Sequence, residues 1–289
     1  MFSQFFGNYL LENQKITAEQ FASCIEYTKV NRVKLGLIAE AEGMLTSRQA
    51  MELNNLQMQS DKRFGDLAVE KGYLTEADVE YLLGRQGSPY LSFAQALEEY
   101  GLFSLEEINQ LVSSYQEENH FSDTVMEAIK NADIGDMLPA FVETEDSRYQ
   151  NLIGLTLRNI VRFVSSYIRI EKGSFISSVT AKYLAYQRTE GEYDGFLGFC
   201  CDDDGILAIA EGYAKESFGT VDEDALDSVG EFTNCVNGLY AAELSYQNVK
   251  IDMLPPELLF DATIDSEGTF YSLPLYVEGK KSNLIVKLA

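Results

Sequence analysis

The feature that most constrains the fold is a repeat with a period of 29 residues in the N-terminal part of the chain. Four copies align without an insertion, and they begin at Phe5, Lys34, Arg63 and Ser92. A fixed period of this length is typical of repeat architectures, in which each copy folds as one supersecondary unit and packs against its neighbours. We therefore predict an N-terminal domain of four similar units over residues 1–116.

Each copy carries the signals of two short helices. In three copies a glycine, at Gly43, Gly72 and Gly101, stands where the first helix should end, and glycine tolerates the left-handed conformation that closes a helix. A hydroxyl residue follows three positions later, and an amide or carboxylate follows after three more, which is the pattern of a capping box. These pairs are Thr17 and Gln20, Thr46 and Gln49, Thr75 and Asp78, and Ser104 and Glu107. The pattern predicts an all-α domain of eight helices in four hairpins.

The two central copies resemble the repeated motif of the N-terminal domain of type II secretion ATPases, one branch of which binds cyclic di-GMP. The motif contains a basic residue, a glycine two positions later, a second glycine and a closing glutamine. The matching positions are Lys34, Gly36, Gly43 and Gln57 in the second copy and Arg63, Gly65, Gly72 and Gln86 in the third. The resemblance implies that Arg63 stacks on or forks to guanine and that backbone amides beside the glycines reach phosphate. All of these positions except the second glycines are candidate nucleotide-binding residues.

A second interpretation of the same residues needs no ligand. Lys34 replaces the arginine of the motif and lacks its planar fork, and the outer copies have Phe5 and Ser92 at this position. Glycines and leucines are also what helical hairpins need in order to pack closely. On this interpretation the repeats form a helical interaction or scaffold module.

The balance of charged residues limits the partners and the chemistry. The chain has 22 Lys and Arg against 46 Asp and Glu, a formal net charge of −24. Such a chain repels polyanions, so we predict no nucleic-acid partner. The single histidine, His120, lies in a polar stretch, which argues against a histidine-centred triad or a zinc site. We therefore predict no metal site belonging to this chain.

Three further features bear on the compartment. No stretch approaches the roughly 20 apolar residues that span a bilayer, and the first residues lack the basic region of a signal peptide. The four cysteines form no C-x-x-C pair. These features predict a cytoplasmic protein without membrane insertion.

The repeat pattern ends near Tyr115, and the rest of the chain has a different organisation. Residues 117–146 are polar and acidic and predict a linker that contains a short helix over 125–131. Residues 147–289 then alternate helical and strand patterns. Helices are predicted over 148–165, 207–218 and 222–245, and strands over 167–170, 174–179, 182–189, 195–201, 249–254, 258–264, 269–277 and 283–287. The pattern predicts an α/β (α+β) domain with helices packed on a mostly antiparallel sheet, and the carboxylates of residues 202–204 are expected to cap the helix over 207–218.

The predicted helix over 222–245 has two different sides. At 100° per residue, its large apolar residues, among them Leu239, fall mainly on the side that must face the sheet. The opposite side presents Asp227, Glu231, Asn234 and Gly238 in one stripe. The small residue at the end of the stripe leaves room for another surface to lie against the helix. Carboxylates and amides on a solvated helix face are common, however, so spacing alone does not establish a site.

The segment Asp227-Ser-Val-Gly-Glu231-Phe-Thr-Asn234 resembles the active-site motif of the CheX and CheC chemotaxis phosphatases, which is Asp or Ser, three residues, Glu, two residues and Asn. The resemblance extends over residues 150–273, and a proline pair at 255–256 lies where the family has a proline. It implies an enzyme that removes phosphate from the aspartate of a CheY-like receiver domain. In that role Glu231 and Asn234 are catalytic, and Asp227 and Gly238 contact the docked receiver.

The resemblance also implies a mechanism and partners. Asn234 holds a water in line with the phosphoryl group, as a positioning glutamine does in GTPases, while Glu231 pairs with a lysine of the receiver. Mg²⁺ comes from the receiver, so the phosphatase needs no cofactor of its own, and by analogy the domain forms a homodimer. The alternative is a non-enzymatic adaptor or cyclic-dinucleotide sensor, in which the CheX-like domain serves as a docking platform.

Overall fold

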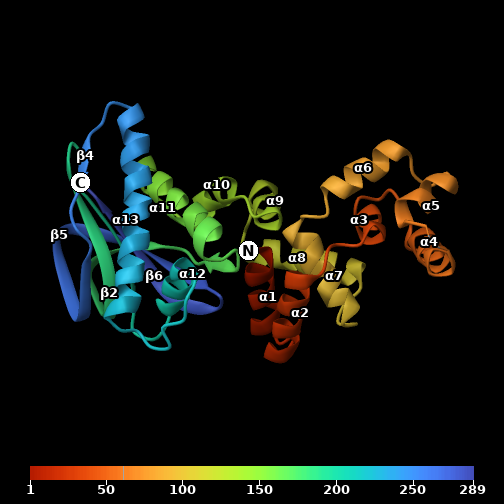
Figure 1. Ribbon diagram of the computed structural model, residues 1–289, viewed down its shortest axis with the longest axis horizontal. Helices are drawn as coiled ribbons and strands as arrows, with labels where there is room; N and C mark the ends of the chain where they lie inside the picture. The colour runs from red at the N-terminus through yellow and green to blue at the C-terminus, as the bar shows by residue number, and fades with distance from the viewer. Residues whose placement is uncertain (61) are drawn as a thin grey trace. The chain divides into compact units, whose positions relative to one another are not determined.

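The computed structural model describes residues 1–60 and 62–289, and the side chains of all of these except residues 266 and 267. The chain divides into two compact units, one of Phe2–Ala132 and one of Asp133–Ala289 together with Met1 (Figure 1). The division falls inside the predicted linker 117–146, so the short helix predicted there belongs with the repeats. Among the helices of the described residues, none has the length and apolar character needed to cross a bilayer.

The first unit consists of helices. They are α1 (Phe2–Glu12), α2 (Ala18–Val30), α3 (Leu35–Ala41), α4 (Ser47–Gln59), α5 (Phe64–Glu70), α6 (Glu76–Gly84), α7 (Pro89–Glu99), α8 (Leu105–Glu118) and α9 (Asp123–Asn131). All four predicted capping boxes are present, at the starts of α2, α4, α6 and α8. The three predicted C-terminal glycines have φ of +69°, +68° and +64°, and Gln14 takes the same conformation in the first copy. The predicted all-α hairpin repeats are confirmed.

The first glycine of the first and third repeats lies against the second helix of its own hairpin. A Cβ added to Gly65 in α5 would stand 2.8 Å from Cγ1 of Val79 in α6. In the first copy, a Cβ on Gly7 would collide with the ring of Phe21. Both neighbours come 14 residues later in the sequence and sit on the second helix of the same hairpin. The glycine therefore serves helix packing within its own repeat.

The second unit combines helices with a sheet. Its elements are α10 (Ile134–Met137), the 3₁₀-turn η1 (Leu138–Ala140), α11 (Ser147–Asn159), the π-helical turn η2 (Ile160–Val164), β1 (Ile168–Ile170), β2 (Ser174–Gly191), β3 (Gly195–Cys201), α12 (Leu207–Ala214), α13 (Glu223–Tyr246), β4 (Ile251–Met253), β5 (Glu257–Val277) and β6 (Lys280–Leu288). The strands predicted over 174–179 and 182–189 are one strand, β2, and those over 258–264 and 269–277 are one strand, β5. The two long strands pair along most of their length, with a register shift between Ile176 and Ser178. This shift and the bend of the strands break the alternation of side chains without ending the strands.

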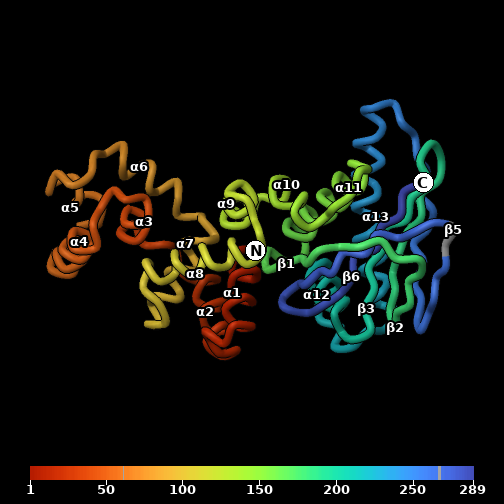
Figure 2. Tube along the Cα trace, turned by 180° about the vertical axis from the view of Figure 1, so that it is seen from behind, coloured from red at the N-terminus to blue at the C-terminus, as the bar shows by residue number. Residues whose placement is uncertain are grey.

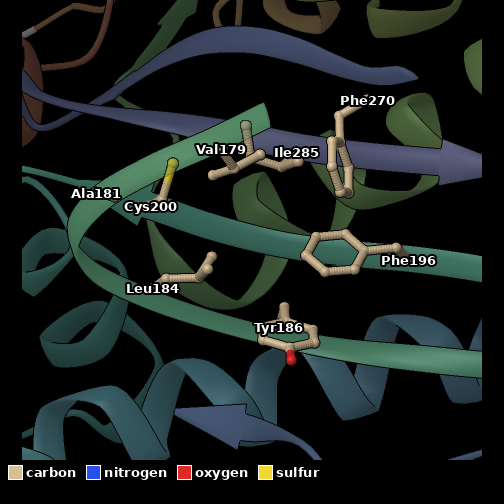
Figure 3. Packing of buried hydrophobic residues seen from close by; sticks show 8 residues of the cluster. All are labelled: Val179, Ala181, Leu184, Tyr186, Phe196, Cys200, Phe270 and Ile285. Carbon is tan, nitrogen blue, oxygen red and sulfur yellow. The ribbon is translucent and has the colours of Figure 1, made fainter. Parts of the chain in front are cut away.

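The strands of the second unit close on themselves. The described pairings are all antiparallel, in the order β1-β5-β6-β3-β2-β4, and β5 pairs with β2 as well. The strands β2, β3, β6 and β5 therefore form a ring, whose interior holds a cluster of buried side chains (Figure 3). These are Val179, Ala181, Leu184, Tyr186, Phe196, Cys200, Phe270 and Ile285. The rings of Tyr186 and Phe196 stack with centroids 4.5 Å apart.

Helices cover the outside of this ring. Figure 1 shows α13 lying across the strands, and it contacts β2, β3, β4 and β5. Phe232 of α13 packs between Phe199 of β3, at a centroid distance of 5.8 Å, and Tyr213 of α12, at 5.3 Å. The strands themselves are traced from the opposite side in Figure 2. The predicted α+β fold, with helices packed on a mostly antiparallel sheet, is confirmed.

Helix α12 begins at Leu207 as predicted, but its capping and its C-terminal end differ from the prediction. Its N-cap is Ile206, which makes no side-chain cap hydrogen bond, so the expected capping by residues 202–204 is wrong. Asp202 instead accepts a hydrogen bond from the backbone amide of Lys182 at 3.1 Å, and Asp204 pairs with Lys280 at 2.6 Å. The helix ends at Ala214, before a left-handed Lys215. The carboxylates tie the loop to neighbouring strands rather than to the helix.

Candidate functional site

The candidate site lies on α13, whose start is strongly determined by sequence. The side chain of Asp222 caps the helix by accepting from the amide of Ala225 at 3.0 Å. Glu223 and Asp224 follow in the first turn, where carboxylates interact favourably with the helix dipole. The buried face consists of Ala225, Leu226, Val229, Gly230, Phe232, Thr233, Val236, Asn237, Tyr240 and Leu244. Leu239, which was expected to face the sheet, is 41% exposed, because it lies at the edge of the apolar side.

The predicted stripe lies only in part on the outer side of α13, because Asn234 meets Gln187 of β2 and Gly238 lies near Met253 of β4. Asp227 and Glu231 are exposed, while Asn234 and Gly238 are half-buried. Neither carboxylate makes a hydrogen bond or an ion pair with any residue that the structure describes. Both carboxylates therefore remain available to groups outside this chain.

The side-chain amide of Asn234 is held by a residue that sequence reasoning missed. Gln187 of β2, which is 1% exposed, donates from Nε2 to Oδ1 of Asn234 at 2.7 Å and to the carbonyl oxygen of Leu254 at 2.7 Å. Its Oε1 accepts from Nδ2 of Asn237, which is 2% exposed, at 2.8 Å. A signal for this network was present, because Gln187 and Asn237 are polar residues at core positions of a strand and a helix.

Two glycines of α13 have different surroundings. A Cβ added to Gly230 would stand 3.2 Å from Leu258 and 3.2 Å from Pro256, so a larger residue here would press on the side chains at the start of β5. Pro256 is one of the prolines that the motif predicted near the site. At Gly238 the nearest atom is Cε of Met253, at 4.0 Å. The packing of the described chain therefore explains Gly230 but not Gly238.

The site on α13 is a helix surface. A cavity of about 580 Å³ in the second unit lies elsewhere, near Arg188, Phe270 and Lys287, and no residue of α13 lines it. An exposed stripe of carboxylates and a half-buried amide suits contact with a macromolecule better than enclosure of a small substrate.

Two of the candidate nucleotide-binding residues in the repeats make polar contacts with their own unit. Nζ of Lys34 pairs with Glu99 at 2.7 Å, and its backbone amide donates to Oε1 of Gln95 at 2.7 Å. This ion pair lowers the pKa of Glu99. Nε2 of Gln86 donates to the carbonyl oxygen of Val33, also at 2.7 Å. These contacts link the second repeat to the fourth and the third repeat to the end of the first.

The candidate glycines also pack against side chains of their own unit. A Cβ on Gly36 would stand 3.1 Å from the ring of Phe64 in the next repeat, and Gly65 faces Val79 as described above. Gln57 and Arg63 are exposed, and no hydrogen bond or ion pair joins either side chain to a described residue.

One hollow of about 490 Å³ in the first unit includes two of the candidates. Lys34 and Gly36 line it, together with the carboxylates of Glu40, Glu98 and Glu106, and the other four candidates do not. Burial raises the pKa of Glu98. Carboxylates at this position repel phosphate groups. Nucleotide binding by the repeats stays a prediction.

Comparisons with known proteins concern the second unit. A family model described as chemotaxis phosphatase CheX matches residues 183–275, a range that contains Gln187, Glu231 and Asn234. A comparison with curated proteins gave no match.

Three solved structures illustrate the similarity of this half of the chain. A putative chemotaxis protein from Desulfovibrio vulgaris Hildenborough is 14% identical, with 50% of this chain and 98% of that chain covered and a TM-score of 0.43. A CheC-like superfamily protein from Shewanella sp. PV-4 is 19% identical, with coverages of 50% and 99% and a TM-score of 0.44. A CheX–CheY–BeF3–Mg²⁺ complex from Borrelia burgdorferi gives 16% identity, coverages of 48% and 96% and a TM-score of 0.40.

Proposed function

Because the C-terminal half of the chain contains a CheX-type domain, we propose that it dephosphorylates the phosphoaspartate of a CheY-like receiver domain. The observation that carries this proposal is the arrangement on α13. A free, exposed carboxylate at Glu231 and a half-buried amide at Asn234 stand one helical turn apart on α13, where Asn234 lies at the boundary between the helix surface and Gln187 of β2. The family model, which describes a chemotaxis phosphatase and matches a range that contains both residues, supports the proposal at the level of the domain.

The proposed reaction requires this chain to position one water molecule. Phosphoryl transfer needs the attacking and leaving oxygens in line. A water that is already held in this position lowers the activation free energy, because it need not be oriented during the reaction. Asn234 would hold this water by its amide, while Glu231 would form an ion pair with a lysine of the receiver and fix the register of docking. Mg²⁺ would belong to the receiver. The proposal requires no histidine, thiol or metal from this chain.

The surroundings of the pair fit a protein partner. Gly238 has no side chain and no close neighbour, so a second surface can approach the helix backbone there. Met253, which is 42% exposed, lies beside it and offers an apolar contact. Asp227, one turn before Glu231, is exposed and free of partners in the described structure. We assign Asp227 and Gly238 to receiver docking.

The test is the decay of a phosphorylated receiver in the presence of the whole chain. We expect Asn234→Ala to slow the accelerated decay by about 100-fold or more, as removal of one catalytic hydrogen-bonding group does in other enzymes, while the protein stays folded. Glu231→Ala should raise the receiver concentration needed for half-maximal rate. Asn131→Ala, at an exposed asparagine of α9, is the matched control and should change nothing.

Two results would contradict the proposal. One is an unchanged rate for a folded Asn234→Ala variant. The other is a receiver that binds the wild-type chain at the α13 surface without any faster loss of phosphate, which would favour the non-enzymatic adaptor instead.

A further inference from the structure

We propose that Gln187 is a positioning residue for the phosphatase reaction, which fixes the amide of Asn234 with Oδ1 inward and Nδ2 outward. The inference rests on the proposed function, because a catalytic role for Asn234 gives this orientation its meaning. It adds a residue from β2, 47 positions earlier in the chain, that the motif on α13 does not contain.

The orientation of the Asn234 amide follows from the carbonyl oxygen of Leu254, which can accept a hydrogen bond but cannot donate one. The carbonyl oxygen of Leu254 has no hydrogen to give, so the amide end of Gln187 that faces it at 2.7 Å must be Nε2. The second hydrogen of this nitrogen reaches Asn234 at 2.7 Å, and therefore the atom of Asn234 that meets it must be Oδ1. A backbone carbonyl thus determines which end of the Asn234 amide is turned into the protein.

The carbonyl end of the Gln187 side chain stabilises the same orientation. Its Oε1 accepts from Nδ2 of Asn237 at 2.8 Å, so a reversed Gln187 would place an oxygen against the Leu254 carbonyl and a nitrogen against the Asn237 amino group. Gln187 is 1% exposed and Asn237 is 2% exposed, so water cannot repair these mismatches. Unpaired buried polar groups cost about 1–3 kcal/mol each, which makes the reversed state rare.

The consequence for the site is a donor presented at the surface. Nδ2 of Asn234 makes no hydrogen bond to any residue that the structure describes, and Oδ1 keeps one lone pair. A water that receives the Nδ2 hydrogen has its oxygen held in place and keeps a second lone pair for phosphorus. Without Gln187, the Asn234 amide would turn about its last side-chain bond and present either end.

The first experiment measures orientation without any receiver. Selective ¹⁵N labelling of asparagine in the whole chain, with signals assigned by Asn234→Ala and Asn237→Ala, reports the exchange of each side-chain amide with water. We expect the Asn234 amide hydrogens to exchange fast and those of Asn237 to be strongly protected. Protected hydrogens on Nδ2 of Asn234 would overturn the inference, whatever the chain does to a receiver.

The second experiment measures the effect on the reaction. Gln187→Met keeps the size of the side chain and removes its hydrogen bonds, and we expect kcat for receiver dephosphorylation to fall about 10-fold to 100-fold, the range seen when a hydrogen-bond partner behind a functional side chain is lost. KM should stay near the wild-type value, because Asp227, Glu231 and Gly238 are untouched.

Thr156→Val in α11 is the matched control for the kinetic arm. Thr156 is 0% exposed, and its hydroxyl donates to the carbonyl oxygen of Leu152, so the variant also removes a buried hydrogen bond and should lower stability without lowering kcat. A folded Gln187→Met variant with wild-type kcat would refute the positioning role while the proposed function stood. A wild-type chain that leaves receiver decay unchanged would refute the proposed function, and the exchange experiment would still decide the orientation.

Discussion

Motif residues of the repeats and motif residues of α13 differ in how many contacts they make with their own fold. In the repeats, Gly65 makes room for a helix of its own hairpin, and Gln86 is bonded to a carbonyl of another repeat. On α13, Asp227 and Glu231 make no hydrogen bond or ion pair with the described residues, and a Cβ at Gly238 would meet nothing closer than Met253, at 4.0 Å. A motif residue that its own fold already uses needs no ligand to explain it. An exposed residue without such contacts remains available to a partner.

The largest effect expected from this comparison is on thiol reactivity. Burial raises the pKa of Cys200 to about 12 and that of Cys24 to about 11, whereas Cys235, next to Asn234, is half-exposed. We expect N-ethylmaleimide at pH 8 to label Cys235 at least about 100-fold faster than Cys24 and Cys200, as read by mass spectrometry of peptides. The adduct should also block receiver dephosphorylation, because it adds bulk to the docking surface, and a Cys235→Ser variant should resist the reagent.

The same buried thiols predict a pH effect with a definite sign. The folded state raises their pKa values, so it favours the protonated thiol, and this contribution to stability is fully present below the pKa of an unfolded thiol, about 8.5. It is lost as the pH rises from there toward about 11 for Cys24 and about 12 for Cys200. Urea unfolding at pH 8 and pH 10.5 should therefore show lower stability at the higher pH, and a Cys200→Ala, Cys24→Ala double variant should show a smaller loss.

The two glycines of α13 give the next largest effect. Gly230→Ala forces a Cβ to within 3.2 Å of Pro256 and Leu258, and we expect a loss of about 1–3 kcal/mol of unfolding free energy from overpacking. Gly238→Ala meets nothing closer than 4.0 Å, so the better helix propensity of alanine should raise stability by about 0.5–1 kcal/mol. The same Gly238→Ala change should weaken receiver docking. Equal changes in unfolding free energy for the two variants would contradict the inference that Gly230 serves packing within the domain and Gly238 does not.

The sequence predicted some parts of this molecule closely because their signals are local. A capping box such as Thr46 with Gln49, or a glycine such as Gly43, fixes backbone conformation through hydrogen bonds and torsions within a few residues. The closure of the sheet is not local. Thr180 of β2 pairs with Thr263 of β5 across 83 positions, and nothing in either strand's own alternation predicts that pairing.

The same division applies to the candidate site. Glu231 and Asn234 could be placed on one face because both belong to one helix with a known angular repeat. Gln187 belongs to a strand, and it reaches Asn234 only because α13 packs on β2. A polar residue in an apolar strand signals that some buried partner exists, but the sequence does not say which one. Sequence patterns within one element therefore found the catalytic candidates, and tertiary packing was needed to find the residue behind them.

A smaller effect is expected from Gln86 in the repeats. Gln86→Ala removes its hydrogen bond to the Val33 carbonyl, and we expect the unfolding free energy to fall by about 1 kcal/mol. Gln57→Ala is the matched change at an exposed glutamine of the same motif and should be neutral within about 0.5 kcal/mol. Chemical denaturation of both variants tests the packing interpretation, and equal losses would contradict it.

The smallest effect is expected at Arg63, the motif residue of the repeats that most resembles a ligand contact. Its side chain is exposed and has no described partner, so Arg63→Ala should change the unfolding free energy by less than about 0.5 kcal/mol. The packing interpretation predicts that calorimetric titration with cyclic di-GMP gives no saturable heat, because Gly65 beside Arg63 already serves packing and carboxylates line the hollow at Lys34. Saturable heat that disappears in Arg63→Ala would reverse this conclusion. In that case Arg63 would be a ligand contact, and the repeats would be a nucleotide-binding module rather than only a helical scaffold.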